Sequence, residues 1–138
     1  MSRDVTRSAP PLVVVIEDEP DLRALVIYTL RAAGFEATGA ATAGEGLAIC
    51  TLQRPAVVVI DRMLADADGI DLCAHLRADE ELADAALLVL SARGSLHDRQ
   101  AGLAAGADDY VVKPFPLDAL VESVRRLAVL ASQRRALR

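Results

Sequence analysis

Aromatic residues, histidine and cysteine are scarce in this sequence. Its 138 residues include no tryptophan, two tyrosines, two phenylalanines and two histidines. The core must therefore be aliphatic, and hydrophobic residues, mainly Val, Leu, Ile and Ala, make up 53% of the chain. The two cysteines, Cys50 and Cys73, do not have a metal-ligand spacing, and we expect them to be reduced and partly buried rather than disulfide-bonded.

Excess positive charge and long apolar runs are also lacking. Lys and Arg number 15 against 20 Asp and Glu, which gives a net charge of −5. Phosphate contacts need clustered Lys and Arg, so we expect no direct nucleic-acid binding by this chain. The chain has no apolar run long enough to cross a bilayer and no signal-peptide core, so we expect no membrane partner and a cytoplasmic location.

Most of the chain is expected to form one domain. Residues 1–11 are polar and end in two prolines, which predicts a flexible N-terminal arm. Residues 12–131 have the size and hydrophobic content of a single domain. Residues 132–138 are rich in arginine and are interpreted as a C-terminal tail or the start of a linker, with the arginines on a solvated face.

Short apolar segments alternate with amphipathic segments along this domain. The apolar ones are rich in β-branched residues, as expected of strands buried on both faces. They are residues 12–16, 35–39, 56–60, 87–90 and 110–112. The amphipathic ones predict helices at residues 20–33, 43–53, 69–78, 95–105 and 117–131 or beyond. This alternation predicts the α/β class: a doubly wound, five-stranded parallel sheet with order 2-1-3-4-5, the flavodoxin-like (βα)5 arrangement.

Polar residues follow four of the five predicted strands. Glu17 and Asp18 follow the first strand, Asp61 the third, Ser91 the fourth and Lys113 the fifth. The carboxyl ends of parallel strands meet at one edge of such a sheet, and ligands bind there beside the point where the strand order reverses. We therefore expect these residues, which are far apart in the sequence, to form one site.

The chemistry of this set favours a divalent cation and a phosphoryl group. Three neighbouring carboxylates repel one another unless Lys113 and a cation compensate them. Carboxylate oxygens suit Mg²⁺, whereas the absence of His and Cys from these strand ends disfavours zinc. A cation and an ammonium group would neutralise phosphoryl oxygens, a hydroxyl would donate a hydrogen bond, and one aspartate would be the nucleophile.

Four segments that contain these residues resemble the receiver domain of two-component response regulators. They are residues 13–20 (VVVIEDEP), 59–61 (VID) with the Asp68-Gly69 pair, 90–94 (LSARG) and 106–115 (GADDYVVKPF). The resemblance covers residues 12–130 and occurs in the same order along the chain. The last two segments are most similar to the transcription-factor branch of the family, which has winged-helix output domains.

The resemblance implies a role for each residue of the acidic set. Asp61 is matched to the phosphoacceptor, and Glu17 and Asp18 to the acidic pair that helps to hold Mg²⁺, for which Mn²⁺ is a substitute. The backbone carbonyl of Met63 is matched to a further metal ligand. The acceptor aspartate would attack the phosphohistidine of a sensor histidine kinase or a phosphotransfer protein.

The remaining matches concern the phosphoryl group and the response to it. Lys113 is similar to the lysine that pairs with the phosphoryl group, before a cis peptide bond to Pro114. Ser91 is matched to the switch hydroxyl. Tyr110 is matched to the switch aromatic, whose ring turns inward when the hydroxyl moves toward the phosphoryl group. The surface of the fourth helix, fifth strand and fifth helix would then change and control an output or partner.

The resemblance implies a signalling phosphoacceptor rather than a turnover enzyme. It also implies a homodimer through the surface of the fourth helix, fifth strand and fifth helix. Ala119 and Ser123, however, stand where the transcription-factor branch typically has the Glu and Arg that form an ion pair across this dimer. Ala65 stands where the family usually has a proline.

Other interpretations compete with this one. A phosphatase of the haloacid-dehalogenase type needs a second aspartate two residues after its nucleophile, where this chain has Met63. A phosphorylation-independent module with the same fold usually lacks the acceptor or the lysine, whereas Asp61 and Lys113 are both present. The acidic residues up to Glu19 could also serve only to cap the helix that begins at Pro20. The sequence favours the phosphoacceptor because it has all the required groups at once.

Overall fold

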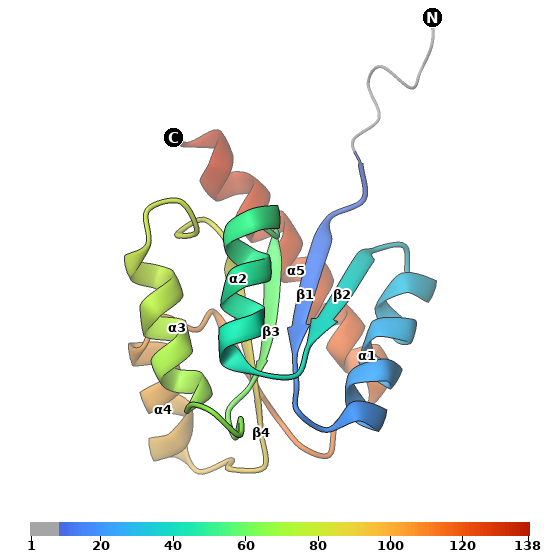
Figure 1. Cartoon of the computed structure of the whole chain (residues 1–138), viewed down its shortest axis with the longest axis vertical. Coiled ribbons are helices and arrows are strands. Elements are labelled where there is room, and N and C mark those ends of the chain that lie inside the picture. Colours follow the sequence, from blue (N-terminus) through green and yellow to red (C-terminus); the bar gives the residue numbers. More distant parts are fainter. Residues whose placement is uncertain (1–8) are drawn as a thin grey trace, which may run out of the picture.

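Five parallel strands alternate with five helices in the computed structural model, which describes residues 9–138 (Figure 1). The strands are β1 (Leu12–Ile16), β2 (Glu36–Ala40), β3 (Val57–Asp61), β4 (Ala86–Ser91) and β5 (Asp109–Val112). The helices are α1 (Pro20–Ala32), α2 (Ala43–Gln53), α3 (Gly69–Ala78), α4 (Leu96–Ala104) and α5 (Leu117–Ala136). The predicted α/β alternation is confirmed, whereas most of the predicted N-terminal arm lies outside the described residues.

The strand order places the ends of β1, β3 and β4 side by side. The order is β2-β1-β3-β4-β5, which confirms the doubly wound topology. Ile16 at the end of β1 is level with Ile60, and Asp61 is level with Leu90 of β4. Glu17 therefore leaves β1 beside Asp61, at the point where the strand order reverses.

Helices cover both faces of the sheet (Figure 1). Val13 and Val15 of β1 pack in one cluster with α1 and α5, and Val14 packs in the other cluster with α2 and α3. Cys50 and Cys73 are free and, rather than partly buried as expected, are fully buried. Strands buried on both faces explain the continuous apolar runs in the sequence.

The turn after β3 brings two stretches of backbone into close contact. Asp68 caps α3, with its Oδ1 accepting a hydrogen bond from the amide of Ile70 (2.9 Å), and it pairs with Met63 in an antiparallel bridge. A Cβ atom on Gly69 would lie 2.5 Å from the carbonyl oxygen of Asp61. Only glycine therefore fits without displacing the strand end, which fixes the loop beside Asp61.

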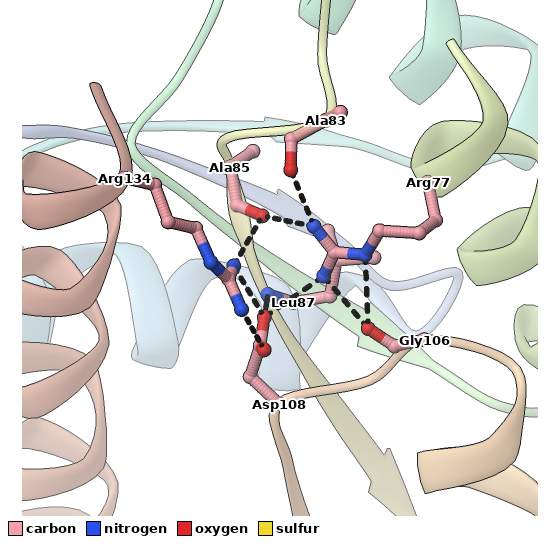
Figure 2. Close-up of polar contacts among 7 residues, drawn as sticks. All are labelled: Arg77, Ala83, Ala85, Leu87, Gly106, Asp108 and Arg134. Atoms are coloured by element: carbon pink, nitrogen blue, oxygen red, sulfur yellow. Dashed lines mark hydrogen bonds and ion pairs between the residues drawn. The ribbon is translucent and has the colours of Figure 1, made fainter. Parts of the chain in front are cut away.

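The end of α5 differs from its interpretation as a tail. The helix continues to Ala136, whereas the sequence placed a tail or linker from residue 132. Arg134, expected on a solvated face, forms an ion pair with Asp108. The same carboxylate accepts hydrogen bonds from Arg77 (2.9 Å) and from the amide of Leu87 (2.9 Å) (Figure 2). This half-buried carboxylate joins α3, β4 and α5, and it gives the last turns of α5 a partner.

The helices were also compared with the length and hydropathy that a bilayer requires. A spanning helix needs about 20 consecutive, mainly apolar residues. Within residues 9–138, no helix combines that length with sufficient apolar character.

Candidate functional site

Glu17, Asp18 and Asp61 lie together at the C-terminal edge of the sheet. Each offers a carboxylate oxygen, and these oxygens lie within 4.8 Å of one another. Glu17 and Asp61 are only 1% and 4% exposed, and Asp18 is more accessible than either. Three hard oxygen ligands in this arrangement could hold a divalent metal ion, so the donor set fits a cation of the Mg²⁺ type.

Lys113 supplies a positive charge to the same site. Its Nζ lies 3.3 Å from Oδ2 of Asp61 and 3.2 Å from Oε1 of Glu17. Burial alone would lower the pKa of Lys113, but the two carboxylates outweigh burial and raise the pKa above its ordinary value. The peptide bond from Lys113 to Pro114 is cis, as the resemblance implied. One ammonium group is thus shared by two carboxylates.

The pKa of Glu17 shows that Lys113 does not fully compensate the negative charge of the site. Burial raises the pKa of Glu17 to about 7, and the hydrogen bond with Asp61 acts in the same direction. The amide of Glu19, which donates to Glu17 (3.2 Å), and the charge of Lys113 act against the shift. The site therefore tends to take up a proton near neutral pH, and a divalent cation would supply the missing positive charge instead.

Glu19 has a different role from its neighbours in the acidic run. Its side chain accepts hydrogen bonds from the amides of Asp21 and Leu22 and caps α1. The capping interpretation is therefore correct for Glu19, while Glu17 and Asp18 turn to the acidic cluster. Capping and the acidic cluster coexist because successive residues after β1 point in different directions.

The loop after Asp61 is fixed at two points. The amide of Met63 donates to Oδ1 of Asp61 (3.1 Å). Asp66 accepts hydrogen bonds from the amides of Ala43 (2.8 Å) and Gly44 (3.1 Å) at the start of α2, and these bonds lower its pKa. Sequence reasoning missed this contact because Asp66 reaches a helix more than twenty residues away in the chain.

Ser91 and Tyr110 are linked through the β4–α4 loop. Ser91 is fully buried, and its Oγ accepts a hydrogen bond from the amide of Arg93 (2.9 Å). Tyr110 is 5% exposed, and its hydroxyl donates to the carbonyl of Arg93 (2.8 Å). Arg62 also reaches this hydroxyl, with Nη1 at 3.2 Å. Sequence reasoning missed Arg62, for which the only available signal is a cation directly after Asp61.

The family comparison agrees with this geometry. The model of the response regulator receiver domain matches residues 13–125. The chain belongs to this family. The matched part of the receiver domain includes every residue of the acidic cluster together with Lys113, Ser91 and Tyr110.

Curated relatives of this receiver domain are transcriptional regulators. The transcriptional regulatory protein PrrA of Mycobacterium tuberculosis is 44% identical over 117 residues, which cover 85% of this chain and 49% of that protein. The phosphate regulon transcriptional regulatory protein PhoB of Rhizobium meliloti is 38% identical over 117 residues, with coverages of 85% and 52%. The receiver domain thus spans about half the length of these relatives, which agree with its likeness to the transcription-factor branch.

Solved receiver structures have the same fold. A putative response regulator from Chloroflexus aurantiacus superposes with a TM-score of 0.82 at 30% identity and covers 87% of this chain and 98% of its own. The chemotaxis protein CheY4 of Vibrio cholerae gives a TM-score of 0.82 at 28% identity, with coverages of 86% and 99%. In contrast to the transcriptional regulators, these structures are matched over nearly their whole length.

Proposed function

We propose that this receiver domain accepts a phosphoryl group on Asp61 from the phosphohistidine of a sensor histidine kinase or a phosphotransfer protein. The main support is the position of Asp61, which is buried between a lysine ammonium group and two further carboxylates. An Asp61 oxygen bonds to phosphorus as the N–P bond of the phosphohistidine breaks, which leaves histidine and an aspartyl phosphate. Water later hydrolyses the acyl phosphate and restores the carboxylate.

The neighbouring residues position and neutralise the transferred group. The carboxylates of Glu17, Asp18 and Asp61, with the carbonyl of Met63, would hold Mg²⁺ or, as a substitute, Mn²⁺. The bound cation would supply positive charge against the phosphoryl oxygens. Lys113, whose Nζ lies 3.3 Å from Oδ2 of Asp61, would supply the second positive charge. The hydroxyl of Ser91 only accepts in its bond with the Arg93 amide, so its own proton is free to donate to the phosphoryl group.

The receiver domain is proposed to act as a switch rather than as a turnover enzyme. Phosphorylation would bias the surface of α4, β5 and α5, where Tyr110 lies between the sheet and α4. The curated relatives suggest control of transcription in a longer protein. Within this chain Asp109 pairs with Arg126 (2.9 Å), so a homodimer through this surface would have to form around, or break, that pair. The homodimer and the cytoplasmic location stay predictions.

Phosphorylation of purified variants tests the proposal. The wild-type chain, incubated with acetyl phosphate and Mg²⁺, should gain one phosphoryl group, detected by intact-protein mass spectrometry. Asp61→Asn should abolish this labelling, and chelation of the metal should do the same. Asp71→Asn, which removes an exposed carboxylate of α3, is the matched control and should label normally. Equal labelling of the Asp61→Asn protein would show that the acceptor assignment is wrong.

A further inference from the structure

Arg62 directly follows Asp61 and is buried. Only 8% of it is exposed, although arginine is rarely buried without partners. Its amide donates to the carbonyl of Leu90 (2.9 Å), and its carbonyl accepts a hydrogen bond from the amide of Gly69 (2.7 Å). These hydrogen bonds fix the Arg62 backbone to β4 and to the start of α3, directly after Asp61 in the chain.

The guanidinium group of Arg62 contacts residues of α4 and β5. Its Nη1 lies 3.2 Å from the hydroxyl oxygen of Tyr110 and 3.5 Å from Oδ1 of Asp98. The Tyr110 hydroxyl donates to the carbonyl of Arg93 (2.8 Å), whose amide donates to Ser91 Oγ (2.9 Å). A continuous line of contacts therefore leaves the acceptor strand, passes through the tyrosine and returns to Ser91.

One donor of this guanidinium group has no hydrogen-bond partner. Nε of Arg62 is buried, and no atom of the described residues accepts a hydrogen bond from it. Oδ1 of Asp68 lies 3.8 Å away, which is too long for a hydrogen bond. Asp68 ends the loop that begins at Asp61, so a small shift of this loop would change the number of partners of Arg62. The guanidinium group is therefore sensitive to the geometry of the acceptor loop.

The inward Tyr110 ring packs in the buried core, against Gly102 of α4 and beneath the guanidinium group of Arg99. A Cβ atom on Gly102 of α4 would lie 2.7 Å from Cδ2 of Tyr110, so a glycine is needed for the ring to fit there. The phenol hydroxyl is satisfied in this position by Arg62 and by the Arg93 carbonyl. Without the guanidinium group, the hydroxyl would lose its donor and keep one acceptor, which weakens the preference for the inward ring.

We propose that Arg62 is a positioning residue that holds the Tyr110 ring inward and couples the ring to the acceptor loop. Only the coupling to the acceptor loop rests on the proposed function. The position of the ring can be measured without phosphorylation. Arg62 acts through Tyr110 and Asp98 and does not itself touch the phosphoryl group. If Arg62 holds the ring in this way, the chain favours the inward ring before any phosphoryl group is present.

The ring position can be followed by ¹⁹F NMR of the chain labelled with 3-fluorotyrosine. The sequence has two tyrosines, and Tyr28 is 73% exposed, so a Tyr28→Phe variant assigns the Tyr110 resonance. The wild-type Tyr110 resonance should be insensitive to replacing H₂O with D₂O. Arg62→Met keeps the apolar stem but removes every donor, and it should give a second, solvent-sensitive Tyr110 resonance. Arg62→Lys should give an intermediate result, because its ammonium group is a point charge without the planar fork.

Beryllofluoride, which mimics the phosphoryl group, tests the coupling to the acceptor loop. In the presence of Mg²⁺, Arg62→Met should weaken beryllofluoride binding by about threefold to tenfold, as is typical of coupled neighbouring residues. In a Tyr110→Phe background, which removes the hydroxyl, the same substitution should have a much smaller effect. If Arg62 had only a structural role, Arg62→Met would lower the urea midpoint, and its effect on beryllofluoride binding would be as large in the Tyr110→Phe background as in the wild type.

Each part of the proposal can fail separately. A single Tyr110 resonance in Arg62→Met, identical to that of the wild type, would show that Arg62 does not hold the ring. A shifted resonance with unchanged beryllofluoride affinity would overturn the coupling to the acceptor loop. If the wild-type chain itself does not bind beryllofluoride, the proposed phosphoacceptor function and the coupling are both wrong, while the resonance still decides whether Arg62 holds the ring.

Discussion

The ammonium group of Lys113 lies 3.3 Å from Asp61 and 3.2 Å from Glu17, so one cation is shared between two buried carboxylates. Burial and the hydrogen bond with Asp61 keep the pKa of Glu17 raised, and the shared ammonium group offsets them only in part. The sharing also means that Lys113 and a bound divalent cation would compete for the same negative charge.

Lys113→Met should therefore increase the affinity for Mg²⁺ while it impairs phosphorylation. Removal of one positive charge from this cluster should strengthen Mg²⁺ binding at least on the order of tenfold, or about 1.4 kcal/mol. Two unit charges about 4 Å apart interact by about 1 kcal/mol in water and by about 4 kcal/mol at an intermediate dielectric. Calorimetric titration at pH 8.5, above the raised pKa of Glu17, measures the affinity. Arg125→Met, which removes a cation that lies over the Phe35 ring instead, is the control. A weaker Mg²⁺ affinity in Lys113→Met would show that Lys113 and the divalent cation do not compete for the same carboxylates.

Stability of the metal-free protein should depend on pH through Glu17. Its pKa is raised from 4.5 to about 7, mainly by burial, so the folded state holds a proton that the unfolded state releases. This contribution is fully present below about pH 4.5 and is lost as the pH rises through about 7. It amounts to at most about 3 kcal/mol, from about 1.4 kcal/mol per pKa unit.

The comparison with Glu17→Gln isolates this effect from other ionisable groups. Urea unfolding in the presence of a chelator measures the free energy of unfolding from pH 5 to pH 8. As the pH rises, this free energy should decrease more for the wild type than for Glu17→Gln. Saturating Mg²⁺ should remove the decrease, because the metal displaces the proton. Parallel stability curves for the two proteins in the chelator would show that Glu17 does not titrate in this range.

Asp66 should control the order of the loop that follows Asp61. Its carboxylate accepts hydrogen bonds from the amides of Ala43 and Gly44, which are otherwise unsatisfied at the start of α2. Asp66→Ala should therefore accelerate hydrogen exchange at these two amides and lower the affinity for Mg²⁺. Asp71→Ala changes the charge equally but should leave both unchanged. Unaltered exchange at Ala43 and Gly44 in Asp66→Ala would be evidence against this anchor.

The network around Asp108 should contribute to stability without affecting phosphorylation. Burial would raise the pKa of Asp108, but bonds from Arg134, the Leu87 amide and Arg77 outweigh burial and lower the pKa. This contribution is present above the unfolded value of 3.8 and is lost as the pH falls through the lower folded pKa. Asp108→Asn should cost about 2 kcal/mol, because two half-buried guanidinium groups lose their charged hydrogen-bond acceptor.

Urea unfolding at neutral pH measures this cost, and acetyl phosphate labelling checks that the site is intact. Glu81→Gln breaks an exposed pair with Arg54 and should cost less than about 1 kcal/mol. Arg134→Met should have an intermediate effect, because Arg77 still contacts Asp108. A similar stability for Asp108→Asn and Glu81→Gln would mean that the network around Asp108 contributes little to stability.

The sequence alone determined the order of the elements and the edge at which the site forms. Continuous apolar runs separated by amphipathic segments specify buried parallel strands with helical crossovers, and this topology places the ends of all strands at one edge. Glu17, Asp61 and Lys113 could be assigned to one site for that reason. Their positions follow from topology, which local hydrophobic patterns determine.

Only the tertiary structure revealed which polar side chains meet across the fold. Arg62 with Tyr110, Asp66 with the start of α2, and Asp108 with Arg134 join residues that are many positions apart. A charged residue next to a strand end, or in a last helical turn, has the same sequence signature whether it is solvated or buried. Its partner depends on the side-chain conformation and on the spacing between packed elements, which local patterns do not contain.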